Sequence, residues 1–97
     1  MEVCLKLYGV FRSAAGSDTI SLQLSDTEPT VRSAIIKLVS RPDCGELKEL
    51  ILDGESLDPR PNTLILVSGR EIGALAGLET RLKKGDELSL LPVAHGG

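Results

Sequence analysis

The chain has 97 residues, of which 41% are apolar and 26% are charged, and its formal net charge is -3. This length and composition are typical of one folded domain and unlike those of a disordered segment. The acidic balance and the presence of only two aromatic residues disfavour direct binding to nucleic acid, because phosphates attract clustered Lys and Arg and unpaired bases stack on aromatic rings.

The start of the chain holds no continuous apolar block, because apolar and polar side chains alternate from residue 2 onward. We therefore expect neither a signal peptide nor a membrane-spanning segment, and a cytoplasmic location. Cys4 and Cys44 are far apart in the sequence, and neither belongs to a C-x-x-C pair. We expect both to be packing thiols rather than metal ligands or a disulfide.

Two strands are predicted in the first quarter of the chain. Residues 2–8 alternate between apolar and polar side chains, which is the pattern of a half-buried strand. A second alternating segment, 20–24, follows the small and turn-prone residues 13–18. We expect the first strand to end at Gly9 and the two strands to form a hairpin.

One amphipathic helix is predicted after Pro29. Thr30 is a candidate N-cap, and apolar residues follow it at helical spacing. These residues are Val31, Ala34, Ile35 and Leu38. The pair Arg41-Pro42 stops the helix, because a residue before proline avoids helical backbone angles. Residues 43–62 suggest a helical turn or two and a tight turn, and the sequence leaves open whether they form an extra docking element or only a connection.

Three further strands are predicted in the last third of the chain. The continuous apolar run 63–67 is typical of a strand, and a tight reversal leads from it to a short strand near Ile72. In residues 87–91, Leu88 and Leu90 alternate with Glu87, Ser89 and Leu91, and Pro92 ends this last strand. We therefore predict one α+β domain over residues 1–92, in which a mixed sheet of about five strands carries one main helix on one face.

Residues 93–97 form a separate tail that ends in Gly96-Gly97. We expect this tail to be flexible, and five extended residues reach roughly 17 Å, far enough to enter the active site of a partner. Without side chains, the two glycines pass through a narrow channel and leave the terminal carbonyl open to a nucleophile. The carboxylate must first be activated, for example as an acyl-adenylate. Because the chain has no phosphate-binding motif, the ATP must be bound by a partner.

Several short segments, spread over nearly the whole chain, carry a resemblance to a known family. They are residues 3–9, 11–12, 30–31, 66–72, 77–80 with Leu82, 85–88 and 91–97. In these segments the chain resembles the ubiquitin-like sulfur carriers of the molybdopterin synthase small subunit type, including the small archaeal modifier proteins. The resemblance implies that the α+β domain has the ubiquitin-like β-grasp fold.

The resemblance also implies a chemical role for Gly97. A ubiquitin-activating-type enzyme would adenylate this residue and convert it to a thiocarboxylate, whose sulfur goes into molybdopterin during molybdenum cofactor biosynthesis. The chain would be a protein cosubstrate with no catalytic residues, bound cofactor or metal of its own, and would act as the small subunit beside the large subunit of molybdopterin synthase. Two alternatives remain open: conjugation of Gly97 to lysines of target proteins, and sulfur donation for tRNA thiolation.

Tyr8 and Leu91 are the candidate residues for partner contact. Both fall on the outward phase of strands whose inward phase is apolar. The resemblance implies that these strands are parallel neighbours, so the two side chains form either a shared exposed patch, of the kind that binds proteins, or two isolated surface residues. Pro92, Val93 and His95 complete the expected contact. We expect His95 to be a spacer in the channel of the partner rather than a general base or metal ligand.

Overall fold

The computed structural model describes residues 1–25 and 27–93. Within these ranges the chain forms five strands, three α-helices and two short 3-10 helices. In chain order they are β1 (Glu2–Leu7), α1 (Gly9–Ala15), β2 (Thr19–Gln23), α2 (Val31–Val39), α3 (Gly45–Ile51), β3 (Thr63–Val67), β4 (Arg70–Glu71), η1 (Ile72–Ala74), η2 (Gly77–Glu79) and β5 (Glu87–Pro92). None of the described helices is long and apolar enough to cross a membrane.

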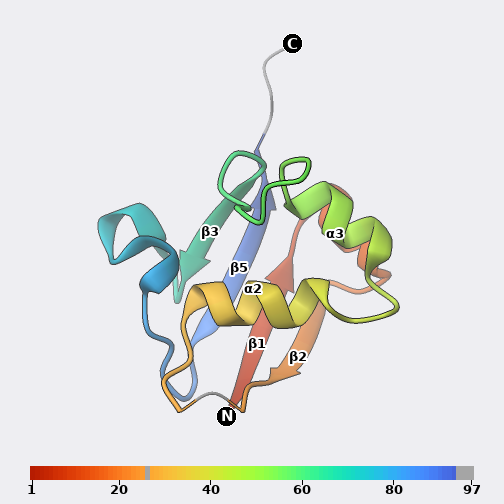
Figure 1. The fold of residues 1–97 in the computed structure, drawn as a ribbon. Helices are drawn as coiled ribbons and strands as arrows, with labels where there is room; N and C mark the ends of the chain where they lie inside the picture. Colours follow the sequence, from red (N-terminus) through yellow and green to blue (C-terminus); the bar gives the residue numbers. More distant parts are fainter. Residues whose placement is uncertain (26, 94–97) are drawn as a thin grey trace.

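The five strands form one mixed sheet in the order β2-β1-β5-β3-β4. The first and last strands of the chain, β1 and β5, are parallel neighbours in its interior (Figure 1), and every other neighbouring pair is antiparallel. Because β1 and β5 run in the same direction, both end at the same edge of the sheet. The described part of the chain therefore ends, at Val93, beside the end of β1.

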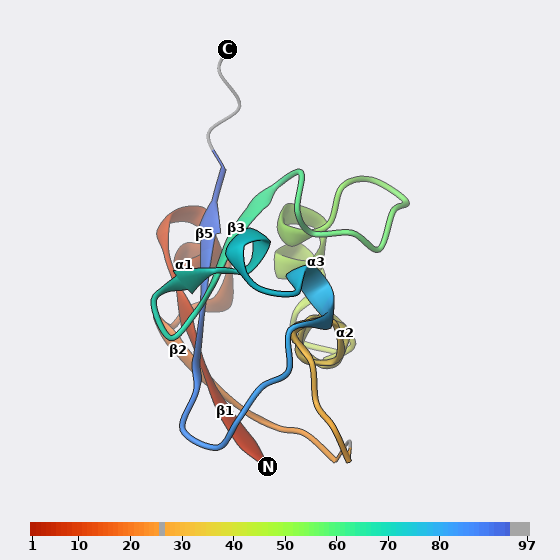
Figure 2. The same cartoon turned by 90° about the vertical axis from the view of Figure 1, so that its left-hand side faces the viewer.

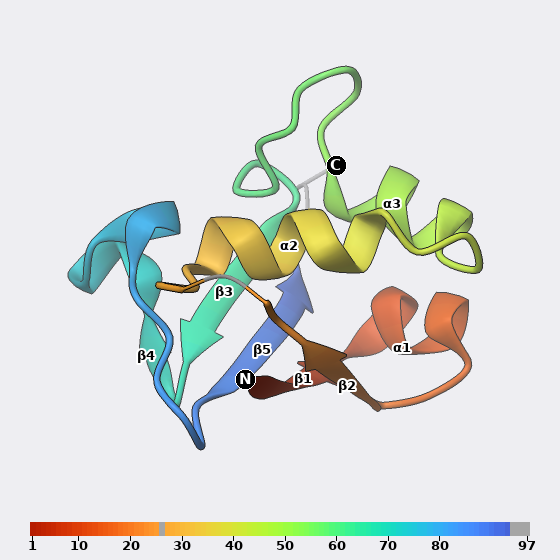
Figure 3. The same cartoon turned by 60° about the horizontal axis from the view of Figure 1, so that its bottom comes forward.

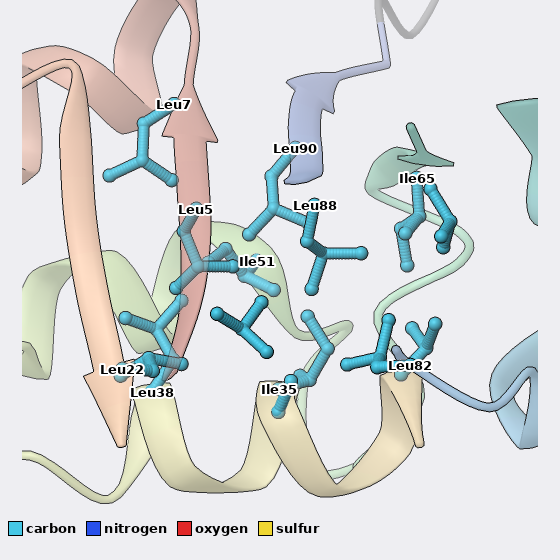
Figure 4. Close-up of a cluster of buried hydrophobic side chains, with 14 of the residues drawn as sticks. Leu5, Leu7, Leu22, Ile35, Leu38, Ile51, Ile65, Leu82, Leu88 and Leu90 are labelled. Atoms are coloured by element: carbon cyan, nitrogen blue, oxygen red, sulfur yellow. The ribbon is translucent and has the colours of Figure 1, made fainter. Parts of the chain in front are cut away.

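Helices lie on one side of the sheet and enclose the core with it. Figure 2 shows α2 and α3 on the same side of β1 and β5, and α1 packs against both α3 and β5. Figure 4 shows the leucines of β1 and β5 directed toward α2. The central side chains of this core, none more than 2% exposed, are Leu5, Leu7, Ile35, Leu38, Leu88 and Leu90. The α+β fold with a helix on one face of a mixed sheet is thus confirmed.

The main helix begins where the sequence predicts. The Thr30 hydroxyl accepts a hydrogen bond from the Ser33 amide at 3.2 Å, and the Ser33 hydroxyl accepts one from the Thr30 amide at 2.8 Å. This reciprocal capping box satisfies two amides near the start of α2. The helix ends at Val39, two residues before Arg41, so the proline stop signal is confirmed to within one turn.

Helix α1 differs from the turn that the sequence predicts between the first two strands. The strands pair antiparallel as predicted, but a seven-residue helix connects them (Figure 3). Phe11 is 1% exposed and anchors this helix in the core. Gly9 begins the helix at φ 55° and Gly16 ends it at φ 73°, backbone angles that glycine adopts without steric cost. The small residues of this segment predict a turn. The burial of Phe11 stabilises a helix there instead, because it gives the segment an apolar anchor in the core.

The two cysteines have different environments. Cys44 is 6% exposed at the start of α3, and burial raises the pKa of its thiol, with the carboxylate of Asp43 adding to the effect. It is a packing thiol, as predicted. Cys4 is exposed, so the same prediction is wrong for this residue, because its position in β1 directs the side chain away from the helices.

Candidate functional site

The open face of the sheet carries a group of exposed and half-buried apolar side chains from three neighbouring segments. They are Tyr8, Leu64, Leu66 and Leu91, which we name the apolar patch. Tyr8 and Leu64 are each 40% exposed, although large apolar side chains are more often buried. A contiguous apolar surface of this kind on a folded domain commonly marks a site of protein contact.

Strand register brings Tyr8 and Leu91 to adjacent strands. Leu7 pairs with Leu90 across β1 and β5, and both side chains are buried against the helices. The backbone of Tyr8 is still extended, and its amide donates a hydrogen bond to the Leu90 carbonyl oxygen at 3.3 Å. Because successive side chains alternate between faces, Tyr8 and Leu91 both point to the open face, as the sequence predicts.

Leu64 and Leu66 are members of the patch that the sequence pattern did not single out. Leu64 pairs directly with Leu91 across β3 and β5, and Leu66 lies two residues further along the same face of β3. The signal was present in the continuous apolar run from Thr63 to Val67. A strand that needs only one buried face has polar residues on the other, so the leucines on the outward phase indicate a second apolar surface.

Away from the patch the open face carries mainly polar side chains, among them Lys6, Ser21 and Gln23, with Cys4 as a small apolar exception. Cys4 and Ser21 pair across β1 and β2, and both are exposed. In β4, Glu71 pairs with Leu66 and so shares the open face, whereas Arg70 pairs with the buried Val67 and lies on the other phase; Arg12 lies in the last turn of α1. Both arginines are exposed, and neither forms an ion pair with another described residue. The patch therefore lies toward the end of the sheet where β1 and β5 finish, and Leu66 extends it along β3 to the level of Ser89.

The last described residues are anchored on both sides. The Val93 amide donates a hydrogen bond to the Asn62 carbonyl oxygen at 2.9 Å. On the other side, Pro92 lies so close to Gly9 that a Cβ atom at Gly9 would be 3.0 Å from Pro92 Cγ. A groove of about 270 Å³ beside these residues is lined by Val10, Phe11, Glu49, Leu50, Asn62, Pro92 and Val93. Pro92 and Val93, two of the predicted contact residues, thus adjoin both the patch and this groove.

The loop that carries Asn62 is held by its own contacts. The Asn62 side-chain amide donates a hydrogen bond to the Leu52 carbonyl oxygen at 2.8 Å. Nearer the tip, the guanidinium of Arg60 donates to the Asp58 carboxylate at 2.7 and 2.9 Å, and these bonds lower the pKa of Asp58 to about 2. Residues 52–62 are therefore an ordered connection between α3 and β3.

The remaining predicted site residues, His95, Gly96 and Gly97, lie outside the described residues. Their roles in adenylation, thiocarboxylation and partner contact stay predictions from the sequence, as does the boundary between a domain at 1–92 and a tail at 93–97. What the described residues supply is the position from which the chain continues: the end of β5, next to the apolar patch.

Comparisons with known proteins agree with the fold and with the resemblance. No protein-family model matches the chain. Small archaeal modifier protein 3 of Haloferax volcanii is 34% identical over 97 residues, which cover 100% of both chains. A protein of Archaeoglobus fulgidus for which a sulfur carrier role is proposed is 34% identical over 73 residues, covering 74% of this chain and 80% of the other.

Two solved structures extend the comparison. The crystal structure of small archaeal modifier protein 1 from Haloferax volcanii matches with a TM-score of 0.79 and 26% identity, covering 100% of both chains. The Pyrococcus furiosus protein proposed to be subunit 1 of molybdopterin converting factor matches with a TM-score of 0.74 and 28% identity, covering 97% of this chain and 99% of the other. The chain therefore belongs to the small archaeal modifier family of ubiquitin-like sulfur carriers, and its sheet and helices form a β-grasp fold.

Proposed function

We propose that the chain is a sulfur carrier whose Gly97 is adenylated, converted to a thiocarboxylate, and used as the sulfur donor in molybdopterin biosynthesis. The observation that carries this proposal is that β5 ends at Pro92 beside the apolar patch, five residues before Gly97 in the sequence. The full-length likeness to the Pyrococcus furiosus protein, for which a molybdopterin role is proposed, supports the same acceptor.

The chemistry proceeds in two displacements at the terminal carboxyl group. A carboxylate oxygen of Gly97 attacks the α-phosphorus of ATP, and pyrophosphate leaves, so that an acyl-adenylate forms. A hydrosulfide equivalent then attacks the carbonyl carbon, and the bond from that carbon to the oxygen of AMP breaks. The products are AMP and a C-terminal thiocarboxylate. A ubiquitin-activating-type partner supplies the ATP site, and the chain itself acts as a non-catalytic cosubstrate.

The chain contributes recognition and positioning to this reaction. The apolar patch provides the apolar area that a partner can bury, and Tyr8 is its aromatic member, a residue type enriched among the residues that dominate binding energy. Pro92, Val93 and His95 follow as the contacts along the entrance to the active site of the partner. Binding energy gained at the patch is then available to hold Gly97 near the reacting phosphate.

A two-stage reaction tests this proposal. The chain is incubated with the adenylating enzyme, ATP and sulfide, and its intact mass is measured. We expect a gain equal to the difference between one sulfur and one oxygen atom, and no gain in a chain that lacks Gly97. The large subunit of molybdopterin synthase and a molybdopterin precursor are then added, and the original mass should return as dithiolene product forms.

The second stage separates the acceptors. If the thiocarboxylate forms but the large subunit does not consume it, the carrier chemistry stands and the molybdopterin role is rejected. If no mass gain occurs at any stage, the sulfur carrier proposal is rejected.

Conjugation to target lysines remains the alternative, and the name of the Haloferax volcanii relative is the observation that favours it. A His95→Arg variant places a trypsin site directly before Gly96-Gly97. If the chain is a modifier, trypsin digestion of cell protein should leave Gly-Gly remnants on lysines that disappear when Gly97 is deleted. Remnants without any thiocarboxylate would overturn the carrier proposal in favour of conjugation.

A further inference from the structure

Two contacts hold the end of β5, one on each side of the strand. Toward β3, the Val93 amide donates to the Asn62 carbonyl oxygen at 2.9 Å. Toward β1, the Pro92 ring lies over Gly9, where an added Cβ would be 3.0 Å from Pro92 Cγ and 3.6 Å from Pro92 Cδ. We name these four residues the root clamp. A larger residue at position 9 would crowd the proline ring and would be strained at φ 55°.

The residue types of the root clamp follow from strand geometry. The backbone amides of a strand point alternately to its two neighbours. Leu90 faces β1, since its carbonyl oxygen accepts from the Tyr8 amide, and Pro92, two residues on, faces the same side. The next ladder bond on that side would run from residue 92 to the Tyr8 carbonyl oxygen, but this oxygen already accepts from the Phe11 and Arg12 amides at 3.1 and 3.4 Å. The missing amide of proline therefore leaves no acceptor unpaired. Val93 faces β3, where its amide finds Asn62.

The β3 side of the clamp rests on rigid elements. The Asn62 side chain donates to the Leu52 carbonyl oxygen at 2.8 Å, and the buried Thr63 hydroxyl donates to the Ile51 carbonyl oxygen at 3.2 Å. These two bonds tie the start of β3 to the end of α3, whose last residue, Ile51, is fully buried. The carbonyl that holds Val93 is therefore fixed relative to the core.

We propose that the root clamp fixes the point from which the reacting tail starts and thereby sets how far the Gly97 carboxylate reaches into the activating enzyme. This inference rests on the proposed function. Four residues, 94–97, follow Val93, and at about 3.3 to 3.6 Å per residue they span at most roughly 14 Å. A carboxylate on a tail of fixed origin cannot make up a lost residue by drawing chain out of the sheet. Gly9, Pro92 and Val93 are thus positioning residues.

Tail length and clamp integrity can be varied independently. Deletion of Ala94 shortens the tail by one residue and leaves the clamp residues in place. The double variant Pro92→Ala/Val93→Pro releases the clamp: alanine lacks the Cγ and Cδ atoms that lie over Gly9, and proline lacks the amide that donates to Asn62. Adenylation is measured as pyrophosphate release at varied chain concentration, so that kcat and KM are obtained separately.

We expect release of the clamp to change the adenylation activity in opposite directions in the full-length chain and in the chain shortened by one residue. Deletion of Ala94 should lower kcat/KM about 100-fold, since misplacement of a reacting group by even about 1 Å can cost that much. Release should lower the activity of the full-length chain, and should raise that of the shortened chain about tenfold, because strand residues freed from the sheet restore the reach. A variant that only destabilised the domain would lower both. The inference is overturned if the shortened chain keeps its full rate or if release fails to improve it.

A second measurement tests the clamp without the enzyme. Hydrogen exchange followed by NMR should show that the Val93 amide is protected in the unmodified chain. Pro92→Ala should reduce that protection about tenfold, which corresponds to a decrease of about 1.4 kcal/mol in the free energy of local opening. Exchange of Val93 at the rate of an unstructured chain would overturn the inference whatever the enzyme does. A protected Val93 in a chain that the enzyme never adenylates would instead reject the proposed function and leave the clamp standing.

Discussion

The two faces of the sheet are apolar for different reasons. The covered face is almost entirely apolar, because α2 and the neighbouring helices bury it, and its buried polar member, Thr63, is hydrogen-bonded to Ile51. The open face carries large apolar side chains only toward the end where Tyr8, Leu64 and Leu91 meet, and is mainly polar at β2 and the start of β1, as at Ser21 and Gln23. Burial in the core explains why the covered face is apolar, but it does not explain the apolar side chains on the open face. An apolar surface that the fold does not need indicates a partner, and this one lies where β5 leads into the C-terminal residues.

The largest expected effect is a difference in the free energy of unfolding between a substitution on the covered face and one on the open face. Leu90 is fully buried on the covered face, and its neighbour Leu91 is half-buried on the open face. Leu90→Ala should lower the free energy of unfolding by about 2 to 5 kcal/mol, since it leaves a cavity in the core. Leu91→Ala should cost about 1 kcal/mol, because much of its surface is already in water. Urea denaturation measures both, and equal losses would remove the distinction.

The second prediction concerns binding to the adenylating enzyme, for which we expect the open face, rather than the covered face, to be decisive. Leu64→Glu places a charge in the apolar patch and should raise KM for the adenylating enzyme at least about tenfold, as loss of a central interface contact does. Ser21→Glu places the same charge at the polar end of the open face and serves as the matched control. Both variants should keep the melting temperature within a few degrees. Equal KM values for the two variants would show that the patch is not the docking surface.

The third prediction uses the two thiols as reporters of the faces. Cys4 is exposed on the open face, whereas Cys44 is buried and its pKa is raised. Because the thiolate is the reactive form, iodoacetamide at neutral pH should modify Cys4 at least about tenfold faster than Cys44 in the folded chain. Peptide mapping after a short reaction identifies the modified residue. Modification of both cysteines at the same rate would mean that α3 does not shield Cys44.

The smallest expected effect lies outside both faces, at Asp58 in the loop before β3. Its folded pKa of about 2 is below the ordinary 3.8, so the Arg60 interaction stabilises the fold above pH 4 and is lost as the pH falls toward 2. Asp58→Asn should cost less than about 1 kcal/mol at pH 7, as exposed ion pairs do, and nothing near pH 2. A larger cost at the lower pH would contradict this sign.

Much of the fold follows from local patterns in the sequence. The alternation in β1 and β5 predicts both strands, and Thr30 with the apolar spacing after it predicts α2. Helix α1 does not follow, because Gly9 and the small residues after it give a turn signal that the burial of Phe11 overrides. Local patterns also cannot give the sheet order. That β1 pairs with β5 came from the resemblance alone, since this contact joins the two ends of the chain.

The candidate site was predictable to the same extent. Tyr8 and Leu91 could be assigned to the open face from alternation. The apolar run at Leu64 and Leu66 indicates a second apolar face of β3, but it does not tell whether that face is buried or exposed. The contact between Gly9 and Pro92 depends on how two distant segments pack, and no sequence pattern signals it. The sequence patterns thus missed the exposure of the outward leucines of β3 and the contact between Gly9 and Pro92. Both features depend on tertiary packing, and both lie beside the start of the predicted tail.

The measurement that tests the central claim most directly is the location of the sulfur after activation. A Cys4→Ser chain, which lacks the exposed thiol, is treated with the adenylating enzyme, ATP and sulfide, and the product is fragmented in a mass spectrometer. We predict that one oxygen is replaced by sulfur and that the replacement lies in the fragment containing Gly97. An unchanged C-terminal fragment, or sulfur found only on Cys44, would contradict the claim that the terminal carboxyl group is the site of chemistry.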